Sequence, residues 1–347
     1  MIRVGVVGLG KMGLAHTAIL STIPDARVVA LADSDRRLGA AVRSMGLRQP
    51  FYTSAEEMLD RETLDAGFVC TPTFTHFDLV QLCLSRNLHV FVEKPMTIRY
   101  EQSKLVANSM KGRRLVTGAG YFFAYRRTFR YAGELLRQGM IGTPRAFRGV
   151  VQHTEVLSPK KGWPFNPRLS GGGVVTNLTS HLLFLLSDYF GQPRAVSADL
   201  RQIHSSSVED EATIRLRYEH GLEGVVESSW CVPGKPILEI TLSVEGNHGV
   251  LTVGHREIRI ELSQARLNFP PGHHRIHESD IPSKPTIDLN PDAGGEAYYL
   301  QDLDFISACK NGAAIRNSFE AALRAEQVLD AIYRSAQERA TITLENA

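Results

Sequence analysis

Residues 2–13 read IRVGVVGLGKMG, a β-branched run that passes directly into a glycine-rich turn. A strand is expected over 2–7 and a helix over 13–22, with a GxGxxG turn between the two. Glycines here let the backbone approach a pyrophosphate, and the N-terminus of the helix favours its negative charge. The pattern therefore predicts a dinucleotide-binding loop made of Gly8, Leu9, Gly10, Lys11, Met12 and Gly13.

Asp33 strengthens this prediction, because it ends the next expected strand, 26–33, twenty residues after Gly13. A carboxylate at that point accepts hydrogen bonds from the adenosine ribose. It would also repel the 2'-phosphate of NADP, which favours NAD as the cofactor. Arg36 and Arg37 follow closely, and an arginine there can hold that phosphate, so NADP remains the alternative.

The first part of the chain continues to alternate strands and helices. Further strands are expected over 65–72 and 88–95, with helices over 54–60, 76–86 and 100–110. Such alternation is typical of an α/β fold with a parallel sheet covered by helices on both faces. A ligand of this fold binds beyond the carboxyl ends of the strands.

Two of these strand ends carry groups capable of chemistry. Thr71, Pro72 and His76 follow one strand, and Glu93-Lys94-Pro95 follows the next, so both sets are expected over the same crevice. Lys94 comes directly after the apolar run HVFV, where partial desolvation would lower the pKa of its amine toward a range useful for acid–base chemistry. His76 is explained equally well as the first residue of a helix.

The pattern changes near Gly120, which is taken as the boundary between domains 1–120 and 121–347. Alternating apolar residues predict strands over 144–154, 194–204, 211–218, 222–230, 236–244 and 248–262. They indicate an antiparallel sheet with one covered face. Helices are expected over 296–310 and 318–337, and packing of these C-terminal helices back on the first domain is left open.

The composition excludes several classes of function. The 347 residues include 39 basic and 37 acidic ones, which are evenly spread, so no nucleic-acid partner is expected. The sequence contains no run of eighteen apolar residues, so no membrane-spanning segment is expected. The four cysteines are far apart in the sequence, which fits reduced thiols in the cytoplasm. His273, His274 and His277 lack an accompanying carboxylate pattern, so no metal site is expected.

Four motifs together resemble the Gfo/Idh/MocA family of sugar and cyclitol oxidoreductases: GLGKMG at 8–13, TPTFTH at 71–76, EKP at 93–95, and the GGG at 171–173 with His181 downstream. The resemblance covers nearly the whole chain. It implies an N-terminal Rossmann domain that binds NAD or NADP, and a C-terminal α+β domain whose large open, mostly antiparallel sheet forms the sugar pocket. The implied reaction transfers a hydride between nicotinamide and a secondary alcohol or ketone of a sugar, nucleotide sugar or cyclitol.

The resemblance also implies roles for single residues. Glu93 corresponds to a glutamate near the nicotinamide ribose, Lys94 to a lysine that hydrogen-bonds the reacting hydroxyl, and Pro95 to a proline that often follows a cis peptide. Asp33, Arg37, Thr71, Pro72 and His76 complete the expected cofactor site, and Tyr121, Phe123 and Trp163 are expected at the substrate. Phe122, Phe123 and Ala124 replace the usual Asn and Arg, so they either make the pocket less polar or belong to the core.

The second departure lies in residues 171–190, GGGVVTNLTSHLLFLLSDYF. The family pattern GGGxxxDxGxH keeps its glycines and His181, but Asn177 replaces the Asp and Thr179 the last Gly. The glycines are expected to make room beside nicotinamide and substrate. An amide cannot accept a proton, so Lys94 and His181 remain for proton transfer. His181 is expected to be the acid–base, with Asn177 and Lys94 bound to the substrate, and the swapped roles of Lys94 and His181 stay open.

Two other functions use the same parts. A bound NAD that transiently oxidises a sugar carbon can drive elimination and hence glycoside cleavage, and a non-catalytic protein can sense NAD(P). The presence of Glu93, Lys94 and His181 argues against the sensor. A homodimer or homotetramer is expected, because relatives often associate through the open sheet.

Overall fold

The computed structural model describes residues 1–158, 160–282 and 295–344, and the chain divides into two compact units. The first unit comprises Met1–Tyr121 and Tyr298–Leu323, and the second comprises Phe122–Ala297 and Arg324–Ala347. The boundary predicted at Gly120 thus lies next to the first crossing of the chain. The segment 298–323 belongs to the first unit and not to the predicted domain 121–347.

The first unit contains a six-stranded sheet in the order β3-β2-β1-β4-β5-β6, and every pair in it is parallel. Its strands are β1 (Ile2–Val7), β2 (Ala26–Ala32), β3 (Phe51–Tyr52), β4 (Ala66–Val69), β5 (His89–Val92) and β6 (Thr117–Ala119). All of β4 and nearly all of β5 are buried, as expected for a strand covered on both faces. The prediction of a parallel α/β sheet is confirmed.

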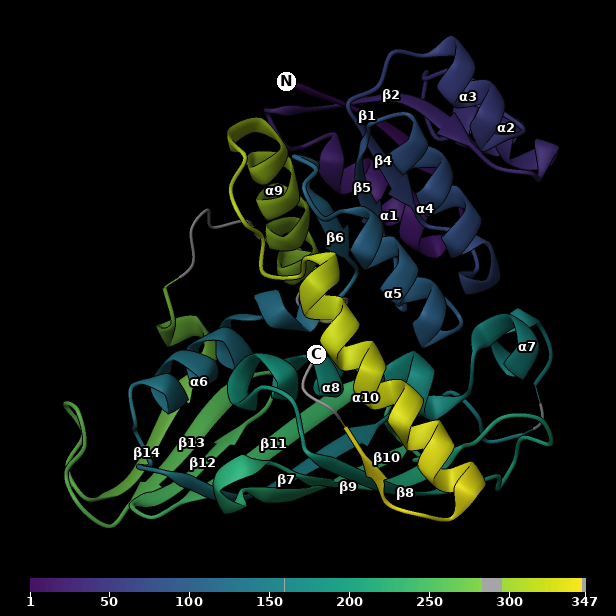
Figure 1. Ribbon diagram of the computed structural model, residues 1–347. Helices are drawn as coiled ribbons and strands as arrows, with labels where there is room; N and C mark the ends of the chain where they lie inside the picture. The colour runs from purple at the N-terminus through teal and green to yellow at the C-terminus, as the bar shows by residue number, and fades with distance from the viewer. Residues whose placement is uncertain (159, 283–294, 345–347) are drawn as a thin grey trace. The chain divides into compact units, whose positions relative to one another are not determined.

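Six helices belong mainly to this unit: α1 (Lys11–Leu20), α2 (Arg36–Ser44), α3 (Ala55–Arg61), α4 (His76–Ser85), α5 (Tyr100–Ser109) and α9 (Gly295–Asn311). The sequence did not predict α2, a nine-residue helix with three arginines that buries only Gly39 and Val42. Helix α9, from the far end of the sequence, packs on the sheet (Figure 1). Its Phe305 ring lies edge-on to Phe68 and Phe91, with centroids 5.3 and 5.7 Å away.

The second unit contains a nine-stranded sheet in the order β14-β13-β12-β11-β7-β10-β9-β8-β15. The strands are β7 (Pro144–Gln152), β8 (Ala195–Arg201), β9 (Glu211–Arg217), β10 (Glu223–Ser229), β11 (Glu239–Gly246), β12 (Gly249–Val253), β13 (Glu257–Leu262), β14 (Gly272–His277) and β15 (Ile342–Thr343). The sheet is mostly antiparallel, as predicted, but β7 and β10 pair in parallel. The single strand predicted over 248–262 is wrong, because the chain turns at Gly254 and forms β12 and β13.

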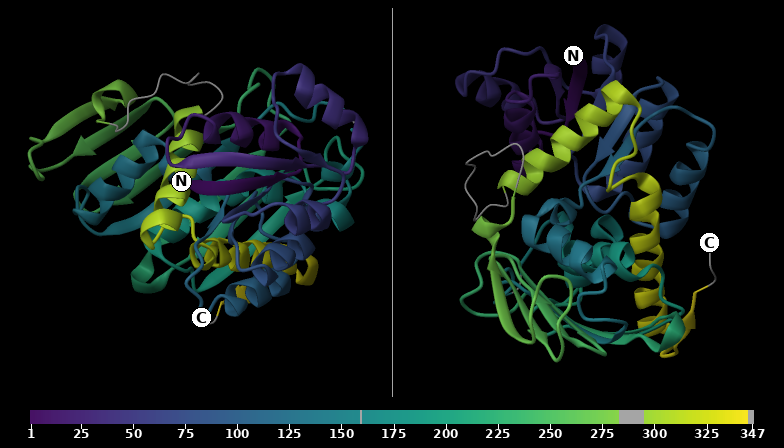
Figure 2. Two further views of the ribbon diagram at one scale, coloured as in Figure 1. Left: turned by 90° about the horizontal axis from the view of Figure 1, so that it is seen from above. Right: turned by 90° about the vertical axis from the view of Figure 1, so that its left-hand side faces the viewer.

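The remaining helices are α6 (Arg127–Arg137), α7 (Pro167–Ser170), α8 (Ser180–Phe190) and α10 (Phe319–Glu338), which begins in the first unit and ends in the second. Helices α6 and α8 lie over one face of the sheet, and no described helix covers the other face (Figure 2). Gly149 of β7 allows close packing of α8, because a Cβ there would lie 2.6 Å from the Leu182 side chain. The prediction of one covered face is confirmed.

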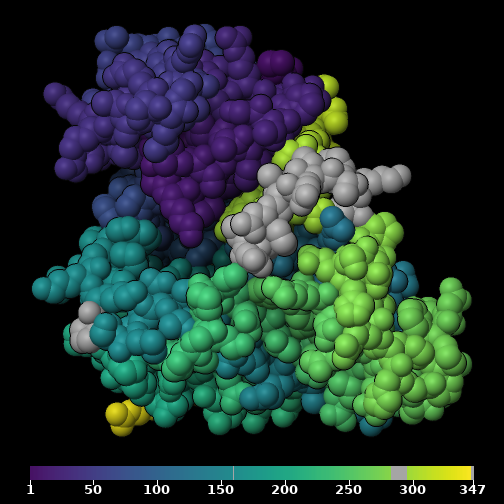
Figure 3. Space-filling model, turned by 180° about the vertical axis from the view of Figure 1, so that it is seen from behind, coloured from purple at the N-terminus to yellow at the C-terminus, as the bar shows by residue number. Residues whose placement is uncertain are grey.

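Two surface features bear on the expected partners. The hairpin of β13 and β14, light green in Figure 3, projects at the surface of the second unit and carries the three histidines at 273, 274 and 277. Among the described residues, no group of three His, Cys, Asp or Glu side chains is placed to hold a metal ion. One described stretch, Pro167–Phe190, is long and apolar enough to cross a membrane, but most of it is buried inside the protein. The core helix of a soluble protein has the same properties.

Candidate active site

The glycine-rich turn after β1 combines close packing with an open surface. Gly8 has φ +89°, and a Cβ on Gly13 would lie 1.8 Å from the Gly8 carbonyl oxygen, so neither position accepts a side chain. A Cβ on Gly10 would meet nothing within 4 Å. Gly10 precedes α1, whose first turn has no side-chain cap and no acidic residue. This uncapped helix end offers backbone N–H groups to an anion.

Asp33 lies at the end of β2, beside this turn. Its Oδ2 atom accepts a hydrogen bond from the Leu9 N–H at 2.7 Å, and Oδ1 accepts one from the Asp35 N–H at 2.9 Å. Each carboxylate oxygen has a second lone pair, which leaves capacity for ribose hydroxyls. The guanidinium of Arg37, predicted to contact the cofactor, instead pairs with the Asp35 carboxylate at 2.7 Å. The turn and Asp33 fit NAD, and in this structure Arg37 is engaged elsewhere.

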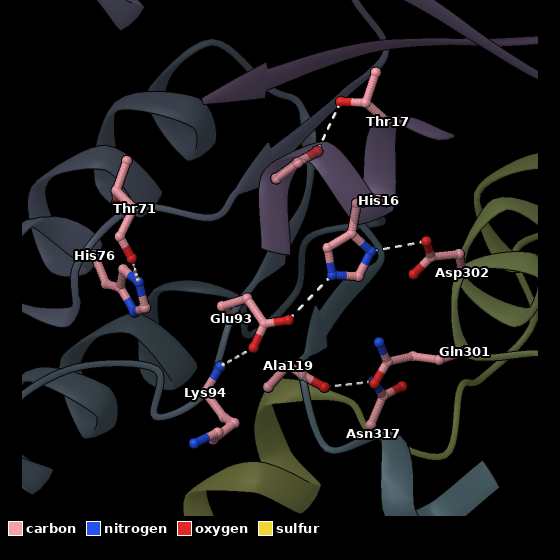
Figure 4. A network of polar contacts seen from close by, with 11 residues as sticks. His16, Thr17, Thr71, His76, Glu93, Lys94, Ala119, Gln301, Asp302 and Asn317 are labelled. Carbon is pink, nitrogen blue, oxygen red and sulfur yellow. Dashed lines mark hydrogen bonds and ion pairs between the residues drawn. The ribbon is translucent and has the colours of Figure 1, made fainter. Parts of the chain in front are cut away.

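A buried network joins α1, β5 and α9 within the first unit (Figure 4). His16 Nε2 lies 3.0 Å from Glu93 Oε1, and His16 Nδ1 lies 2.8 Å from Asp302 Oδ2. A neutral imidazole has only one N–H, so two flanking carboxylates are satisfied when the ring is protonated. Burial opposes this protonation, but Asp302 and Glu93 outweigh it and raise the pKa of His16 to about 10. The sequence analysis identified neither His16 nor Asp302.

This network fixes the start of the Glu93-Lys94-Pro95 turn. Glu93 Oε2 accepts a hydrogen bond from the Lys94 N–H at 3.1 Å. Gly120 leaves room for the carboxylate, because a Cβ there would lie 2.5 Å from Glu93 Oε2. Both Glu93 oxygens therefore have partners in the protein. The predicted contact of Glu93 with the nicotinamide ribose stays a prediction.

Lys94 follows β5 and is half-buried, as expected, and the Lys94–Pro95 peptide bond is cis, also as expected. Burial lowers the pKa of the Lys94 amine to about 8, although the Glu93 charge acts in the opposite direction. Its Nζ atom extends away from the Glu93 carboxylate in Figure 4. The lysine is thus prepared for hydrogen bonding or proton exchange near neutral pH.

His76 joins the two strand-end turns. It is the first residue of α4, and its buried ring lies 2.8 Å from the carbonyl oxygens of both Thr71 and Pro95. Burial lowers the pKa of His76, against the effect of the two carbonyls. Both ring nitrogens face protein atoms, so His76 supports the site by holding Thr71 and Pro95. Pro72 precedes the short helical turn Thr73–Thr75, and its carbonyl accepts the Thr75 N–H at 3.0 Å.

In the second unit, Asn177 lies in a π-helical turn, Val175–Thr179, that leads into α8. The sequence analysis did not identify this wider turn. Within Gly172–Ser187, a stretch described in full, Asn177 is the one residue that is not buried. π turns of this kind are frequent at functional sites. The side chain of Asn177 is therefore the part of this segment best exposed to a ligand.

His181 lies in α8 and is buried against aromatic rings. The Phe122 and Phe123 ring centroids each lie 5.0 Å from that of His181, with Phe122 edge-on. Phe123 also contacts the rings of Phe129 and His255, at 5.7 and 5.3 Å. The surroundings of the imidazole are thus largely apolar.

Tyr121 and Phe123, two predicted substrate contacts, are buried among core residues of the protein. Their predicted contact with substrate stays a prediction. The core alternative is correct for Phe123 and for Ala124, whereas Phe122 is half-buried and reaches the edge of the cluster. Trp163 lies in a short helical turn, Trp163–Phe165, and is 38% exposed. Its predicted contact with substrate stays a prediction.

Two of the three consecutive glycines, Gly172 and Gly173, are packed against other parts of the protein. A Cβ on Gly172 would lie 1.8 Å from the Tyr333 hydroxyl oxygen, and a Cβ on Gly173 would lie 2.2 Å from the Glu209 carbonyl oxygen. These two glycines make room for parts of the protein itself. The sequence analysis did not identify Glu209 or Tyr333, although Glu209 comes just before the predicted strand 211–218.

Two family models match the chain and together cover more than half of it. Residues 2–121 match an oxidoreductase family with an NAD-binding Rossmann fold, and residues 129–252 match the GFO/IDH/MocA C-terminal domain. The chain belongs to the Gfo/Idh/MocA family. It is therefore an oxidoreductase with an NAD-binding Rossmann domain, as the resemblance implied.

Several characterised members of the Gfo/Idh/MocA family are similar to this chain. The scyllo-inositol 2-dehydrogenase (NAD(+)) of Bacillus subtilis is 25% identical, over 92% of this chain and 94% of its own. The D-apiose dehydrogenase of Paraburkholderia graminis is 25% identical, over 98% and 89%. Levoglucosan dehydrogenase in complex with NADH and levoglucosan has the same fold, with a TM-score of 0.87, 22% identity and coverage of 99% and 100%. These relatives favour dehydrogenation over glycoside cleavage by transient oxidation and over a sensor.

Proposed function

We propose that this member of the Gfo/Idh/MocA family interconverts a secondary alcohol and a ketone on a sugar, nucleotide sugar or cyclitol, with NAD as the hydride carrier. The observation that carries the proposal is the combination, in one unit, of an open helix N-terminus at Gly10, the Asp33 carboxylate beside it and the half-buried Lys94. The relatives, which are dehydrogenases of inositol, apiose and levoglucosan, support this substrate class.

Oxidation of an alcohol removes a hydride from carbon and a proton from oxygen, and bound NAD supplies the acceptor for the hydride. Lys94, with a pKa of about 8, is mostly charged at neutral pH and stabilises negative charge that develops on the substrate oxygen. His181 takes the hydroxyl proton, and the Asn177 amide orients the hydroxyl through a hydrogen bond. The alternative assignment gives the proton to Lys94 and the hydrogen bond to His181.

The test measures NADH formation with NAD and a panel of myo-inositol, scyllo-inositol, D-apiose, levoglucosan and UDP-N-acetylglucosamine. Lys94→Met and His181→Ala should each lower kcat by at least ~100-fold, while the Kd for NADH stays within about twofold. Full activity of either variant on a substrate identified with the wild type would refute that residue's role. Absence of NADH formation with every compound, despite tight NADH binding, would contradict the proposed substrate class.

We also propose a cytoplasmic homodimer or homotetramer that associates through the uncovered face of the nine-stranded sheet. That face carries ion pairs between neighbouring strands, such as Arg148–Glu227 and Arg217–Glu223. In a symmetric dimer, the same charged residues of a second copy would face them and form ion pairs between the subunits. Light scattering after size exclusion measures the mass directly. A monomer at micromolar concentration would contradict the proposal.

A further inference from the structure

The carboxylate of Glu209 holds the beginning of the segment that carries Asn177. Its Oε1 atom accepts hydrogen bonds from the Gly173 N–H at 2.9 Å, the Val175 N–H at 3.1 Å and the Tyr333 hydroxyl at 2.7 Å. The Glu209 backbone adds a fourth bond, from the Val174 N–H to its carbonyl oxygen at 3.0 Å. Three consecutive backbone N–H groups are thus bound by one residue.

Tyr333, on α10, extends this arrangement to the next residue of the segment. Its hydroxyl donates to Glu209, and the same oxygen lies 2.8 Å from the Thr176 hydroxyl. Because the single phenolic hydrogen is used on the carboxylate, Thr176 is the donor in the second contact. The chain from Gly173 to Thr176 is therefore fixed at every residue immediately before Asn177.

The neighbouring glycines show how tightly this contact is built. The Gly172 backbone passes so close to the Tyr333 ring that a Cβ would lie 2.4 Å from the ring carbon bearing the hydroxyl. Gly173 is packed against the Glu209 backbone in the same way. A buried carboxylate with three donors on one oxygen costs desolvation, and the hydrogen bonds offset that cost only while this geometry is kept.

We propose that Glu209 and Tyr333 are positioning residues for the reaction, which fix the π turn so that Asn177 and His181 are presented to the substrate. This inference rests on the proposed roles of Asn177 and His181. Neither Glu209 nor Tyr333 needs to touch the substrate. What the segment requires from Glu209 is a hydrogen-bond acceptor at Oε1 and not a negative charge.

The test compares Glu209→Ala, Glu209→Gln and Tyr333→Phe on the sugar or cyclitol that gives the fastest NADH formation. Glu209→Ala should lower kcat/KM for that substrate at least ~30-fold, with NADH affinity within about twofold of wild type, because the NAD-binding turn lies in the other unit. Glu209→Gln keeps an acceptor oxygen and should recover most of the loss, and Tyr333→Phe should fall between the two. Tyr218→Phe, at a buried tyrosine of the same unit, serves as the matched control and should keep wild-type kcat/KM.

Amide hydrogen exchange at Gly173 and Val175 provides a readout that remains informative if Glu209→Ala does not fold. Faster exchange at these amides in Tyr333→Phe than in Tyr218→Phe supports the proposal, and equal exchange overturns it. Equal losses of kcat/KM in Glu209→Ala and Glu209→Gln also overturn it. If His181→Ala abolishes turnover while Glu209→Ala and Tyr333→Phe keep wild-type kcat/KM, the positioning role is wrong and the proposed function stands. If His181→Ala keeps full activity, the proposed role of His181 fails instead.

Discussion

His16 and Glu93 form a buried ion pair, with Nε2 of the imidazole 3.0 Å from Oε1 of the carboxylate and the His16 side chain fully inaccessible to solvent. The pair connects the helix that follows the glycine-rich turn to the residue before Lys94. Asp302 binds the other ring nitrogen of His16, so the C-terminal part of the sequence completes this contact. Buried charged side chains thus link the helix after the glycine-rich turn to the residue that precedes Lys94.

Replacement of Glu93 should change the pH dependence of catalysis. The Glu93 charge raises the pKa of Lys94 against the stronger effect of burial, so Glu93→Gln should lower that pKa further below its present value of about 8. The limb of the kcat–pH profile that reports Lys94 should move to lower pH by up to about one unit. Lys94→Arg is the control, because arginine stays charged and should abolish that limb. An unmoved limb in Glu93→Gln would contradict the assignment to Lys94.

Loss of the His16 imidazolium should change how stability depends on pH. The folded state raises the pKa of His16 from 6.5 to about 10, so it binds an extra proton between these values. This stabilisation is fully present below pH 6.5 and is lost as pH rises toward about 10. The difference in unfolding free energy between wild type and His16→Gln should therefore shrink across this window, as urea unfolding at several pH values can measure. Thr17→Val, a buried change on the same helix, should show a constant difference.

Asp33 should control the choice between NAD and NADP. Asp33→Ser removes the carboxylate that repels a 2'-phosphate, and should raise kcat/KM for NADP relative to NAD by at least about tenfold. Adding Asp35→Ala, which releases Arg37 from its ion pair, should increase the ratio further. Asp25→Ser removes an acidic residue that pairs with Lys310, and should leave the ratio unchanged. A cofactor ratio that Asp33→Ser does not alter would disprove this role.

The adjacent phenylalanines 122 and 123 should behave differently when each is truncated. Phe123→Ala opens a cavity in the core and should lower the unfolding free energy by about 3–5 kcal/mol. Phe122→Ala affects a half-buried ring beside His181, so it should cost less stability and should mainly raise KM for the substrate. Thermal unfolding and steady-state kinetics on both variants distinguish the two outcomes. Equal effects on stability would show that both rings are core.

Local sequence patterns predicted the strongly apolar strands and the helix start that follows the glycine-rich turn. The apolar runs after Met1 and before Lys94 became β1 and β5, and the glycine pattern became an uncapped helix start. Short elements such as β3, with two residues, and α2, with nine, were not predicted, because a periodic pattern needs more residues to be recognised. The parallel pairing of β7 with β10 was not predicted either, because the direction in which two strands pair is set by tertiary contacts.

In the candidate site as well, the residues of local motifs could be predicted and the residues brought near them by folding could not. Asp33, Lys94 and Asn177 could be selected because each stands at a recognisable motif. Their supporting residues could not, because Asp302 is 286 positions from His16 and Tyr333 is 157 positions from Thr176. The packing of Gly172 against Tyr333 and of Gly173 against Glu209 could not be predicted either, because only the folded chain reveals which neighbour excludes a side chain.

The first unit is built from two separated stretches of sequence, and this order has a consequence for synthesis on the ribosome. A nascent chain that has reached Tyr121 contains the glycine-rich turn, Asp33 and Lys94, but it lacks Asp302 and Phe305. The aromatic core around Phe68 and Phe91 stays incomplete, and His16 keeps only one of its two carboxylate partners, until almost the entire polypeptide has emerged. The nucleotide-binding half begins first and is finished last, which couples its maturation to that of the half encoded between its pieces.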